Sequence, residues 1–422
     1  MKFMSARVKS VPATFADGTV LDSGFVDISD GACAAPLQPE GATAQAVPQS
    51  VEASRKAREE FRRHVSSLLR TENLAVLCGL GTSLCITGPD GTRRFPTMWD
   101  LWEAARDLDP KRFADLCKAA RLPMDSRNIE ELLSRARMVE TLRSTKRRAA
   151  FIRDVEGLIW GRCSHQPEED DLLLHGQFLT SLARRPTKLA RAKVFTTNYD
   201  LCLEAAASAM GFVVVDGFSH THPQKFAGSH FEYDLVRRKP DDGGTPEFLP
   251  NVFHLYKLHG SVDWDQDGST VRKSSNPKKP VMIYPRESKF QSSFEQPFFE
   301  MMSRFHSTLR KPDLGLLIVG FGFNDDHLVE PIRSAIASNI SLRLLVVDPA
   351  LEAMFSPSSQ AKPNPKKPTS THSHLKALLD DGDDRVAFLS TGFEALAKQL
   401  PTLVTRTDEE LHERRVQKAM QT

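Results

Sequence analysis

Short, mostly apolar runs that end at glycine or polar residues recur along the chain. LAVLC at 74–78 runs into Gly79, and LLIV at 316–319 runs into Gly320. Similar runs occupy 192–195, 212–215, 252–256, 281–284, 342–347 and 386–389. A continuous apolar run before a turn is typical of a strand that is buried on both faces, as in a parallel sheet.

Segments with helical periodicity separate several of these runs. Residues 51–70 carry an apolar stripe of Val65, Leu68 and Leu69, and the charge-rich stretch at about 98–190 has helical patterns throughout. Strands that alternate with helices predict an α/β fold. We expect a Rossmann-like, doubly wound, mostly parallel sheet, with the stretch at about 98–190 as a helical insert between strands.

The two ends of the chain differ from this pattern. Residues 1–50 are rich in Ala, Pro, Gly and Ser, which favours a flexible N-terminal arm, although TVLDSGFVDISDG within it is compatible with a weak hairpin. Residues 404–422 hold a capping box at Thr407 and Glu410 and predict a C-terminal helical tail. Residues 51–403 are then one domain that includes the insert.

Composition and charge exclude several classes of protein. The 422 residues carry a net charge of +2, so we expect no direct nucleic-acid binding and no membrane association. The six cysteines form no C-x-x-C pair, which argues against a disulfide scaffold and a zinc ribbon and favours free thiols in a reducing cytoplasm. No apolar stretch approaches the roughly 18 residues of a membrane span, and the first residues lack the apolar core of a signal peptide.

Glycine turns follow two of the predicted strands. In an open α/β sheet, ligands bind outside the carboxyl ends of the strands. Gly79-Leu80-Gly81-Thr82-Ser83 follows one strand and Gly320-Phe321-Gly322-Phe323-Asn324-Asp325 follows another, and backbone N–H groups in such turns can cradle a phosphate. A tight structural turn explains the first motif equally well, because the third glycine of the dinucleotide fingerprint is missing at its spacing.

Polar side chains follow three further strands. Thr197, Asn198 and Asp200 come directly after one strand, and His259 comes after another. An Asn can hold a ribose hydroxyl or a water. A His, with an unperturbed pKa of about 6.5, suits general-base catalysis. Asp200 has a structural alternative as the cap of the following helix, and a lone His is more often structural. Asp348 follows a third strand, where a ribose or an adenine edge can be bound.

Taken together, these strand ends resemble the sirtuin family, and most closely its bacterial sirtuin-like branch known from anti-phage defence systems. The matching motifs are Gly79 to Ser83 for the first glycine turn, Thr197 to Asp200 for the asparagine element, Lys257 to Ser261 for the catalytic histidine element, and Gly320 to Asp325 for the later glycine turn. They follow the family's order across roughly 74–400.

The resemblance implies NAD⁺ as substrate and its hydrolysis to nicotinamide and ADP-ribose, in the NAD-depleting effector of a defence system. Asn198 would hold the ribose and the attacking water, His259 would be the general base or would activate a ribose hydroxyl, and Asp200 would steady the site. The residues that bind NAD⁺ would be Gly79, Gly81, Thr82, Ser83, Thr197, Gly320, Gly322, Asn324 and Asp348.

The sequence departs from the protein-deacylating sirtuins, which build a zinc module on two C-x-x-C pairs. No zinc is expected here, and the acyl-lysine platform that the zinc module supports is in doubt. An NAD-dependent deacylase or ADP-ribosyltransferase, and a non-catalytic module that binds NAD or ADP-ribose, remain alternatives. The resemblance also implies control by assembly, as a homo-oligomer and with a separately encoded partner such as a HerA-type ATPase or another defence component.

Overall fold

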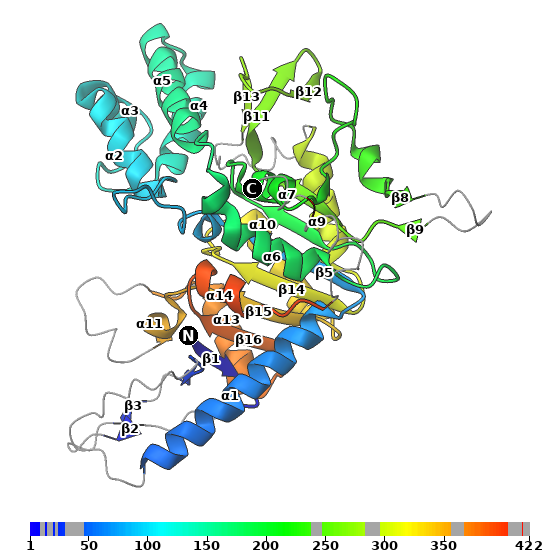
Figure 1. Cartoon of the computed structure of the whole chain (residues 1–422). Helices are drawn as coiled ribbons and strands as arrows, with labels where there is room; N and C mark the ends of the chain where they lie inside the picture. The colour runs from blue at the N-terminus through cyan, green and yellow to red at the C-terminus, as the bar shows by residue number, and fades with distance from the viewer. Residues whose placement is uncertain are drawn as a thin grey trace.

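A nine-stranded sheet forms the centre of the molecule, with the strand order β4-β1-β16-β15-β14-β5-β6-β10-β7 (Figure 1). The structure, a computed structural model, describes residues 1–8, 13–14, 20–21, 24–29, 46–237, 247–282, 296–355, 367–403 and 416. The parallel strands are β5 (Asn73–Cys78), β6 (Lys193–Thr196), β7 (Val213–Val215), β10 (Val252–Lys257), β14 (Leu314–Val319), β15 (Arg343–Val347) and β16 (Val386–Ser390). The predicted α/β fold with a mostly parallel sheet is confirmed.

Helices cover both faces of this sheet, because alternate strand residues point to opposite sides. Leu74 and Val76 of β5 join one core, and Ala75 and Leu77 join the other. The first core is covered by α1 (Ala46–Leu69), α6 (Leu173–Ala183), α7 (Cys202–Ala209) and α14 (Phe393–Gln399). The second is covered by α9 (Phe298–Leu309), α10 (Asp326–Ser338), α11 (Leu351–Phe355) and α13 (Ser370–Asp380).

Two short segments within residues 1–50, where a flexible arm is expected, pair with the central sheet. β1 (Lys2–Ser5) pairs antiparallel with β16, and β4 (Val26–Asp27) pairs antiparallel with β1. Phe3 is fully buried and packs edge-to-face on Phe61 of α1, with ring centroids 5.5 Å apart. The apolar signal here is only a few residues long, so only pairing with a distant strand makes it a strand. A small ribbon joins β2 (Ala13–Thr14) and β3 (Val20–Leu21).

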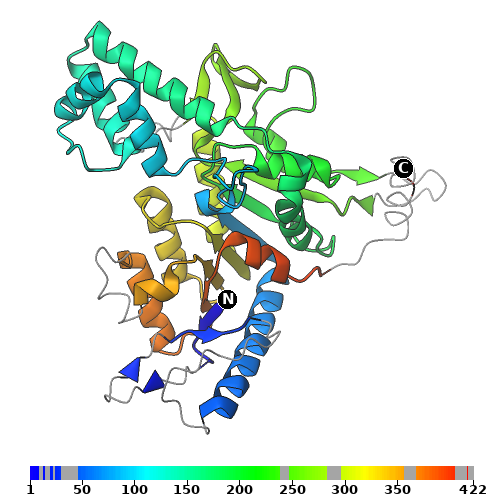
Figure 2. The ribbon, with the colours of Figure 1, turned by 60° about the vertical axis from the view of Figure 1, so that its left-hand side comes forward.

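The predicted helical insert divides into two parts. α2 (Met98–Leu108), α3 (Pro110–Ala119), α4 (Ile129–Leu142) and α5 (Lys146–Cys163) pack around a third core, in which Trp102 meets Phe113 edge-to-face at 5.0 Å and which also includes Val262 and Met282. α6 instead packs in the helical layer of the sheet, where Phe178 contacts Phe393. Helical periodicity identifies an apolar face but not the core that the face joins, so within the expected insert the four helices α2 to α5 form one module and α6 packs with the central sheet. This module and α1 lie at opposite ends of the molecule in both views (Figures 1 and 2).

Smaller elements complete the described structure. β11 (Gly260–Asp267), β12 (Thr270–Lys273) and β13 (Pro280–Met282) form a separate antiparallel sheet, so Val281 and Met282, the described part of the apolar run at 281–284, belong to this sheet. β8 (Val236–Arg237) pairs with β9 (Glu247–Phe248), and single turns occur at η1 (Leu80–Thr82), η2 (Glu169–Leu172) and η3 (Gly228–Glu232). Among the described helices, none combines the length and the apolar character that crossing a membrane requires. The predicted tail at 404–422 lies outside the described residues except for Val416.

The strand order creates one topological switch point, between β5 and β14. The chain leaves β5 for β6 on one side, whereas it leaves β14 for β15 on the other side. In open α/β sheets, the crevice for ligands lies at the carboxyl ends of the strands at such a point. Both predicted glycine turns begin there.

Candidate functional site

The two glycine turns touch each other at the switch point. A Cβ atom on Gly79 would lie 2.4 Å from the carbonyl oxygen of Gly320, and one on Gly81 would lie 2.6 Å from the Cα atom of Gly320. Gly320 also has a φ of +62°, in the left-handed region that favours glycine. These three glycines therefore let two backbones approach at a distance that any side chain would prevent.

Four backbone N–H groups of the first turn donate to acceptors within the protein. The N–H groups of Gly79 and Gly81 donate to the carbonyl oxygens of Val319 and Gly320, at 2.9 and 3.1 Å. The N–H groups of Thr82 and Ser83 donate to the carbonyl oxygens of Gly79 and Leu80 within the turn, at 3.0 and 2.9 Å. The N–H group of Gly320 donates to the carbonyl oxygen of Val347 at 3.0 Å. The structural interpretation of the first motif accounts for these groups, and Leu80, the remaining residue of the turn, lines the cavity described below.

A cavity of about 1000 Å³ opens beside these turns. Of the residues assigned to the site from the sequence, those that line it are Gly79, Thr197, Asn198, Asp200, His259, Gly320, Gly322 and Asn324. Gly81, Thr82 and Ser83 of the same turn, and Asp348 after β15, are not among the residues that line the cavity. The carboxylate of Asp348 accepts the N–H of Ala350 at 2.7 Å, which gives this residue a structural role in the turn after β15.

Asn198 is held by its side-chain nitrogen. Nδ2 donates toward the carbonyl oxygen of Gly79 at 3.1 Å, Thr82 Oγ1 at 3.1 Å and Ser83 Oγ at 2.9 Å. The Gly79 carbonyl can only accept, so it fixes which atom of the amide is nitrogen. Among the described residues, no donor hydrogen-bonds to Asn198 Oδ1. This oxygen is therefore the atom that Asn198 can offer to a ligand in the cavity.

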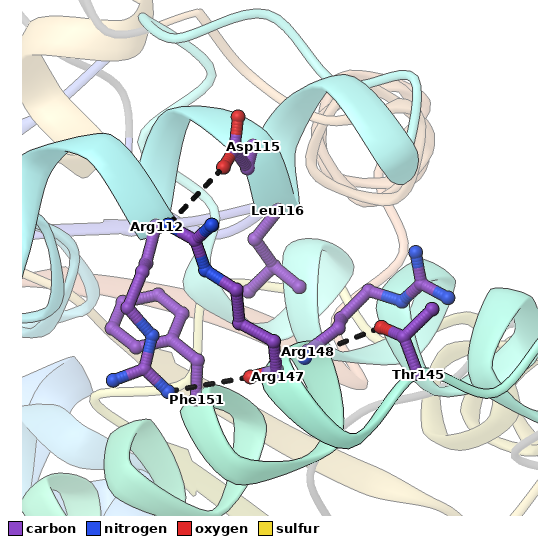
Figure 3. A pocket seen from close by; sticks show the side chains of 7 residues that line it. All are labelled: Arg112, Asp115, Leu116, Thr145, Arg147, Arg148 and Phe151. Carbon is purple, nitrogen blue, oxygen red and sulfur yellow. Dashed lines mark hydrogen bonds and ion pairs between the residues drawn. The ribbon is translucent and has the colours of Figure 1, made fainter.

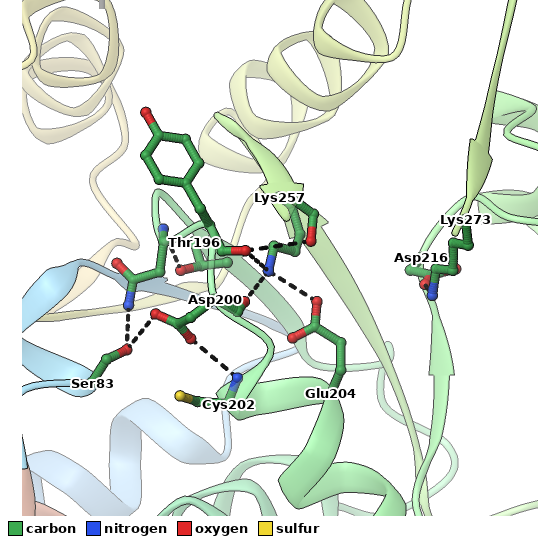
Figure 4. A network of polar contacts seen from close by, with 11 residues as sticks. Ser83, Thr196, Asp200, Cys202, Glu204, Asp216, Lys257 and Lys273 are labelled. Carbon is green, nitrogen blue, oxygen red and sulfur yellow. Dashed lines mark hydrogen bonds and ion pairs between the residues drawn. The ribbon is translucent and has the colours of Figure 1, made fainter. Parts of the chain in front are cut away.

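Asp200 supports both the helix and the asparagine. One carboxylate oxygen accepts the backbone N–H of Cys202 at 3.1 Å, in the first turn of α7, and the other accepts the hydroxyl of Ser83 at 2.8 Å (Figure 4). Ser83 in turn accepts from Asn198. The capping interpretation of Asp200 is thus compatible with a second role, because the same carboxylate orients the Ser83 hydroxyl toward Asn198.

A buried lysine fixes the backbone behind these residues. Lys257, at the end of β10, is 2% exposed. Its ammonium group donates to the carbonyl oxygen of Asp200 and forms an ion pair with Glu204 at 3.0 Å (Figure 4). Burial raises the pKa of Glu204 above its usual range, and the ammonium group of Lys257 opposes that shift. Sequence analysis assigned no role to Lys257, although a lysine at the end of a buried strand is an unusual residue in such a run.

His259 lies against a second histidine. It is 3% exposed and follows β10 by two residues. Its Nε2 atom is 3.3 Å from Nε2 of His327, and the two rings stack with centroids 5.4 Å apart and planes 25° apart. His327 belongs to the first turn of α10 and also lines the cavity. The sequence gives no role for His327, because nothing in the motif after Gly320 indicates that its side chain contacts His259.

Carboxylates surround the cavity. Glu130 and Glu131 at the start of α4 line it from the insert, and Asp325 and Asp326 line it at the N-terminus of α10. Among the described residues that line it, none is lysine or arginine. The site is therefore electrostatically negative around its two imidazoles, which favours positive charge inside it.

The basic hollow of the molecule lies elsewhere. A cavity of about 180 Å³ in the insert is lined by Arg112, Arg147 and Arg148 together with Asp115, Leu116, Thr145 and Phe151 (Figure 3). Two of its arginines form ion pairs with carboxylates: Arg112 pairs with Asp154 at 3.2 Å, and Arg148 pairs with Glu140 at 2.7 Å. The guanidinium of Arg112 also lies over the ring of Phe151, at 4.7 Å. The predicted site residues gather only around the larger cavity.

The described residues hold no group of three or more His, Cys, Asp or Glu arranged to bind a metal ion. The cysteines that the structure describes are unpaired thiols at Cys78, Cys85, Cys117, Cys163 and Cys202. The predicted free thiols are confirmed for these positions, whereas Cys33 lies outside the described residues. Burial raises the pKa of Cys163, the cysteine that lines the cavity, to about 12, so it is a thiol and not a nucleophilic thiolate at neutral pH.

Comparison with known families agrees with this geometry. Residues 192–363 match the family model described as a SIR2-like domain. The matched range contains Asn198, Asp200, His259 and the second glycine turn, while the first glycine turn lies before it. The match supports a sirtuin-like family and an NAD-related function for the chain. A search of curated proteins found no match.

Proposed function

We propose that the protein is an NAD⁺ glycohydrolase that cleaves the bond between nicotinamide and ribose. The observation that carries the proposal is the geometry of Asn198. Its amide nitrogen is held by three acceptors, which leaves Oδ1 for a ligand in the cavity that His259 also lines. An oriented acceptor and a base at one cavity match the needs of hydrolysis through an oxocarbenium-like state.

The reaction then follows from the groups present. The C–N bond to the pyridinium breaks, its electron pair returns to the ring nitrogen, and neutral nicotinamide leaves. A water that Asn198 Oδ1 orients attacks the anomeric carbon of the ribose, and His259 accepts the proton that this water loses. The proton passes to solvent after ADP-ribose forms. The carboxylates that line the cavity favour the positive charge that develops on the sugar.

A direct assay tests this proposal. Purified protein is incubated with NAD⁺ over a range of protein concentrations, with and without an acyl peptide, and nicotinamide and ADP-ribose are quantified. We expect release that does not depend on the peptide, and a reduction of at least about 10²-fold in Asn198→Ala and His259→Ala. The matched controls are Asn276→Ala and His374→Ala, which change exposed residues outside the cavity.

The outcomes separate the alternatives. Rapid NAD⁺ cleavage by both site variants would contradict the roles given to Asn198 and His259. Release only with an acyl peptide favours the deacylase, and tight binding without release favours a non-catalytic module. Thermal unfolding of each variant shows whether a lost rate reflects lost folding.

We extend the proposal to the protein's biological role. Uncontrolled NAD⁺ cleavage is lethal to a cell, so a cytoplasmic effector of anti-phage defence requires restraint. We propose control through a homo-oligomer and a separately encoded partner, such as a HerA-type ATPase. Light scattering after size exclusion, with and without a co-expressed partner, tests this step. A monomer that is fully active alone at every concentration is the opposing result.

A further inference from the structure

We propose that His259 and His327 act as one proton-sharing pair, in which His327 is the positioning residue that orients His259 for proton transfer. This inference rests on the proposed function, since it names the group that controls the base of that reaction. The proposal stands on three features of the structure: the position of the two rings, the proton balance between them, and the charges around them.

The two rings come from opposite sides of the switch point. His259 follows β10, and His327 follows β14, and these strands are separated in the sheet by β5 and β6. Each ring has an anchored backbone beside it. The N–H of Leu258 donates to Thr196 at 2.8 Å, and the N–H of Leu328 donates to Asp325 at 2.9 Å, and both leucines are fully buried. The contact at 3.3 Å thus joins two fixed elements across the crevice.

A hydrogen bond between two Nε2 atoms needs one proton in the gap. Two protons would oppose each other, and so would two lone pairs. We assign the proton to His259, so that neutral His327 accepts it. This tautomer of His259 leaves the lone pair on Nδ1, which is the atom that takes the proton from water. The resulting imidazolium of His259 keeps its Nε2–H bond to His327, and the partner ring stabilises the new charge.

The surroundings favour this division of roles. His327 stands in the first turn of α10, where the helix dipole disfavours a positive charge and so suits the role of acceptor. Two cationic rings in contact would repel each other, so the pair holds one charge before it holds two. The carboxylates that line the same cavity are Asp200 from the turn after β6, Asp325 and Asp326 at the N-terminus of α10, and Glu130 and Glu131 from α4. They stabilise a single charge on the pair.

Variants at His327 test the role of the acceptor. His327→Phe keeps a ring but removes the acceptor, whereas His327→Gln restores an acceptor oxygen. We expect His327→Phe to lower kcat for NAD⁺ cleavage by about 10-fold or more with a smaller change in KM. We also expect the acid limb of its pH–rate profile to move to lower pH, because the His259 imidazolium loses its partner. His327→Gln should recover part of both effects. Glu330→Gln, an exposed change on the same helix, should match the wild type.

A titration that does not depend on catalysis separates this inference from the proposed function. The ¹⁵N shifts of histidine-labelled wild type, His259→Ala and His327→Phe report the tautomer and the titration of each ring. We expect the Nε2–H tautomer of His259 in the wild type, and a titration of each ring that changes when its partner is removed. Rings that titrate independently, or a wild-type pH–rate profile in His327→Phe, would overturn the pair and leave NAD⁺ cleavage standing. Absence of cleavage by the wild type contradicts the proposed function, while the titration still decides whether the rings share a proton.

Discussion

The side-chain amide of Asn198 donates to the carbonyl oxygen of Gly79 at 3.1 Å, and this bond joins the end of β6 to the first glycine turn. The neighbouring strands β5 and β6 therefore present their ends as one unit. The glycine turn supplies the three acceptors around the amide nitrogen of Asn198, a residue that also lines the cavity.

Asn198→Asp tests this arrangement with almost no change in shape. The variant replaces the donating nitrogen by a carboxylate oxygen that faces the Gly79 carbonyl oxygen. Two buried acceptors then repel each other. We expect a loss of about 1–3 kcal/mol in the free energy of unfolding, together with a fall in NAD⁺ cleavage of at least about 10²-fold. Chemical denaturation and nicotinamide release measure the two effects. Asn276→Asp is the exposed control, and a stable, active Asn198→Asp protein is the contrary outcome.

Asp200→Asn distinguishes capping from support of the site. The amide oxygen can still accept the N–H of Cys202, so the cap survives, but Ser83 then loses its charged acceptor. We expect a small loss of stability, of about 1 kcal/mol, and a fall in kcat of about 10-fold or more. If Asp200 were only a cap, the folded variant would cleave NAD⁺ at the wild-type rate, which measurements below its unfolding temperature would reveal.

The charge of the cavity predicts a preference for NAD⁺ over NADP⁺. The 2′-phosphate of NADP⁺ adds about two negative charges to a site that is lined by carboxylates and, among the described residues, by no lysine or arginine. We expect kcat/KM to be lower for NADP⁺ by about 10-fold or more. The double variant Glu130→Gln, Asp326→Asn should narrow this difference, and Glu330→Gln should not. Equal use of both dinucleotides by the wild type contradicts the electrostatic argument.

Stability below neutral pH depends on a buried histidine of α1. His64 is 7% exposed, its Nε2 lies 3.2 Å from the carbonyl oxygen of Leu344, and burial lowers its pKa to about 4. The unfolded chain, with a pKa near 6.5 at this residue, takes up the proton first, so stability declines as the pH falls from about 6.5 toward 4. We expect His64 to account for roughly 3 kcal/mol of that decline.

His64→Gln removes the titrating group and keeps a donor for Leu344. The free energy of unfolding of this variant should change less between pH 7 and pH 4 than that of the wild type, while the exposed control His374→Gln should follow the wild type. Denaturation curves at each pH give the comparison. An identical slope in His64→Gln and the wild type would show that His64 does not carry the effect.

The sequence was sufficient for features that are decided locally. The apolar run before Gly79 identifies β5, and the polar residues after β6 and β10 lie at the cavity because the ends of parallel strands meet at one edge. The sequence was insufficient for features that depend on a residue far away in the chain. The N–H groups of Gly79 and Gly81 looked available for phosphate until β14 supplied their acceptors, and His327 acquires its partner only when β10 and β14 are placed across the crevice.

The same dependence on distant partners applies to α6 and to the first strand of the chain. α6 has the helical pattern of the insert, yet its apolar side chains join the core beneath the sheet. Phe3 gives too short a signal for a strand until it pairs with Leu389 of β16. A pattern along the chain reports which face of an element is apolar, and only the tertiary structure shows what that face covers.

The pairing of β1 with β16 has a consequence for synthesis. Met4 stands opposite Phe388, so a strand that leaves the ribosome early obtains its neighbour only when nearly all of the described chain has followed it. Until then the side of β15 that β16 will occupy, and the side of β1 that faces β16, have no native partner, whereas β4 can already pair with the other side of β1. Closure of this sheet edge is therefore a late event, which delays completion of the fold until the chain around residue 390 has emerged.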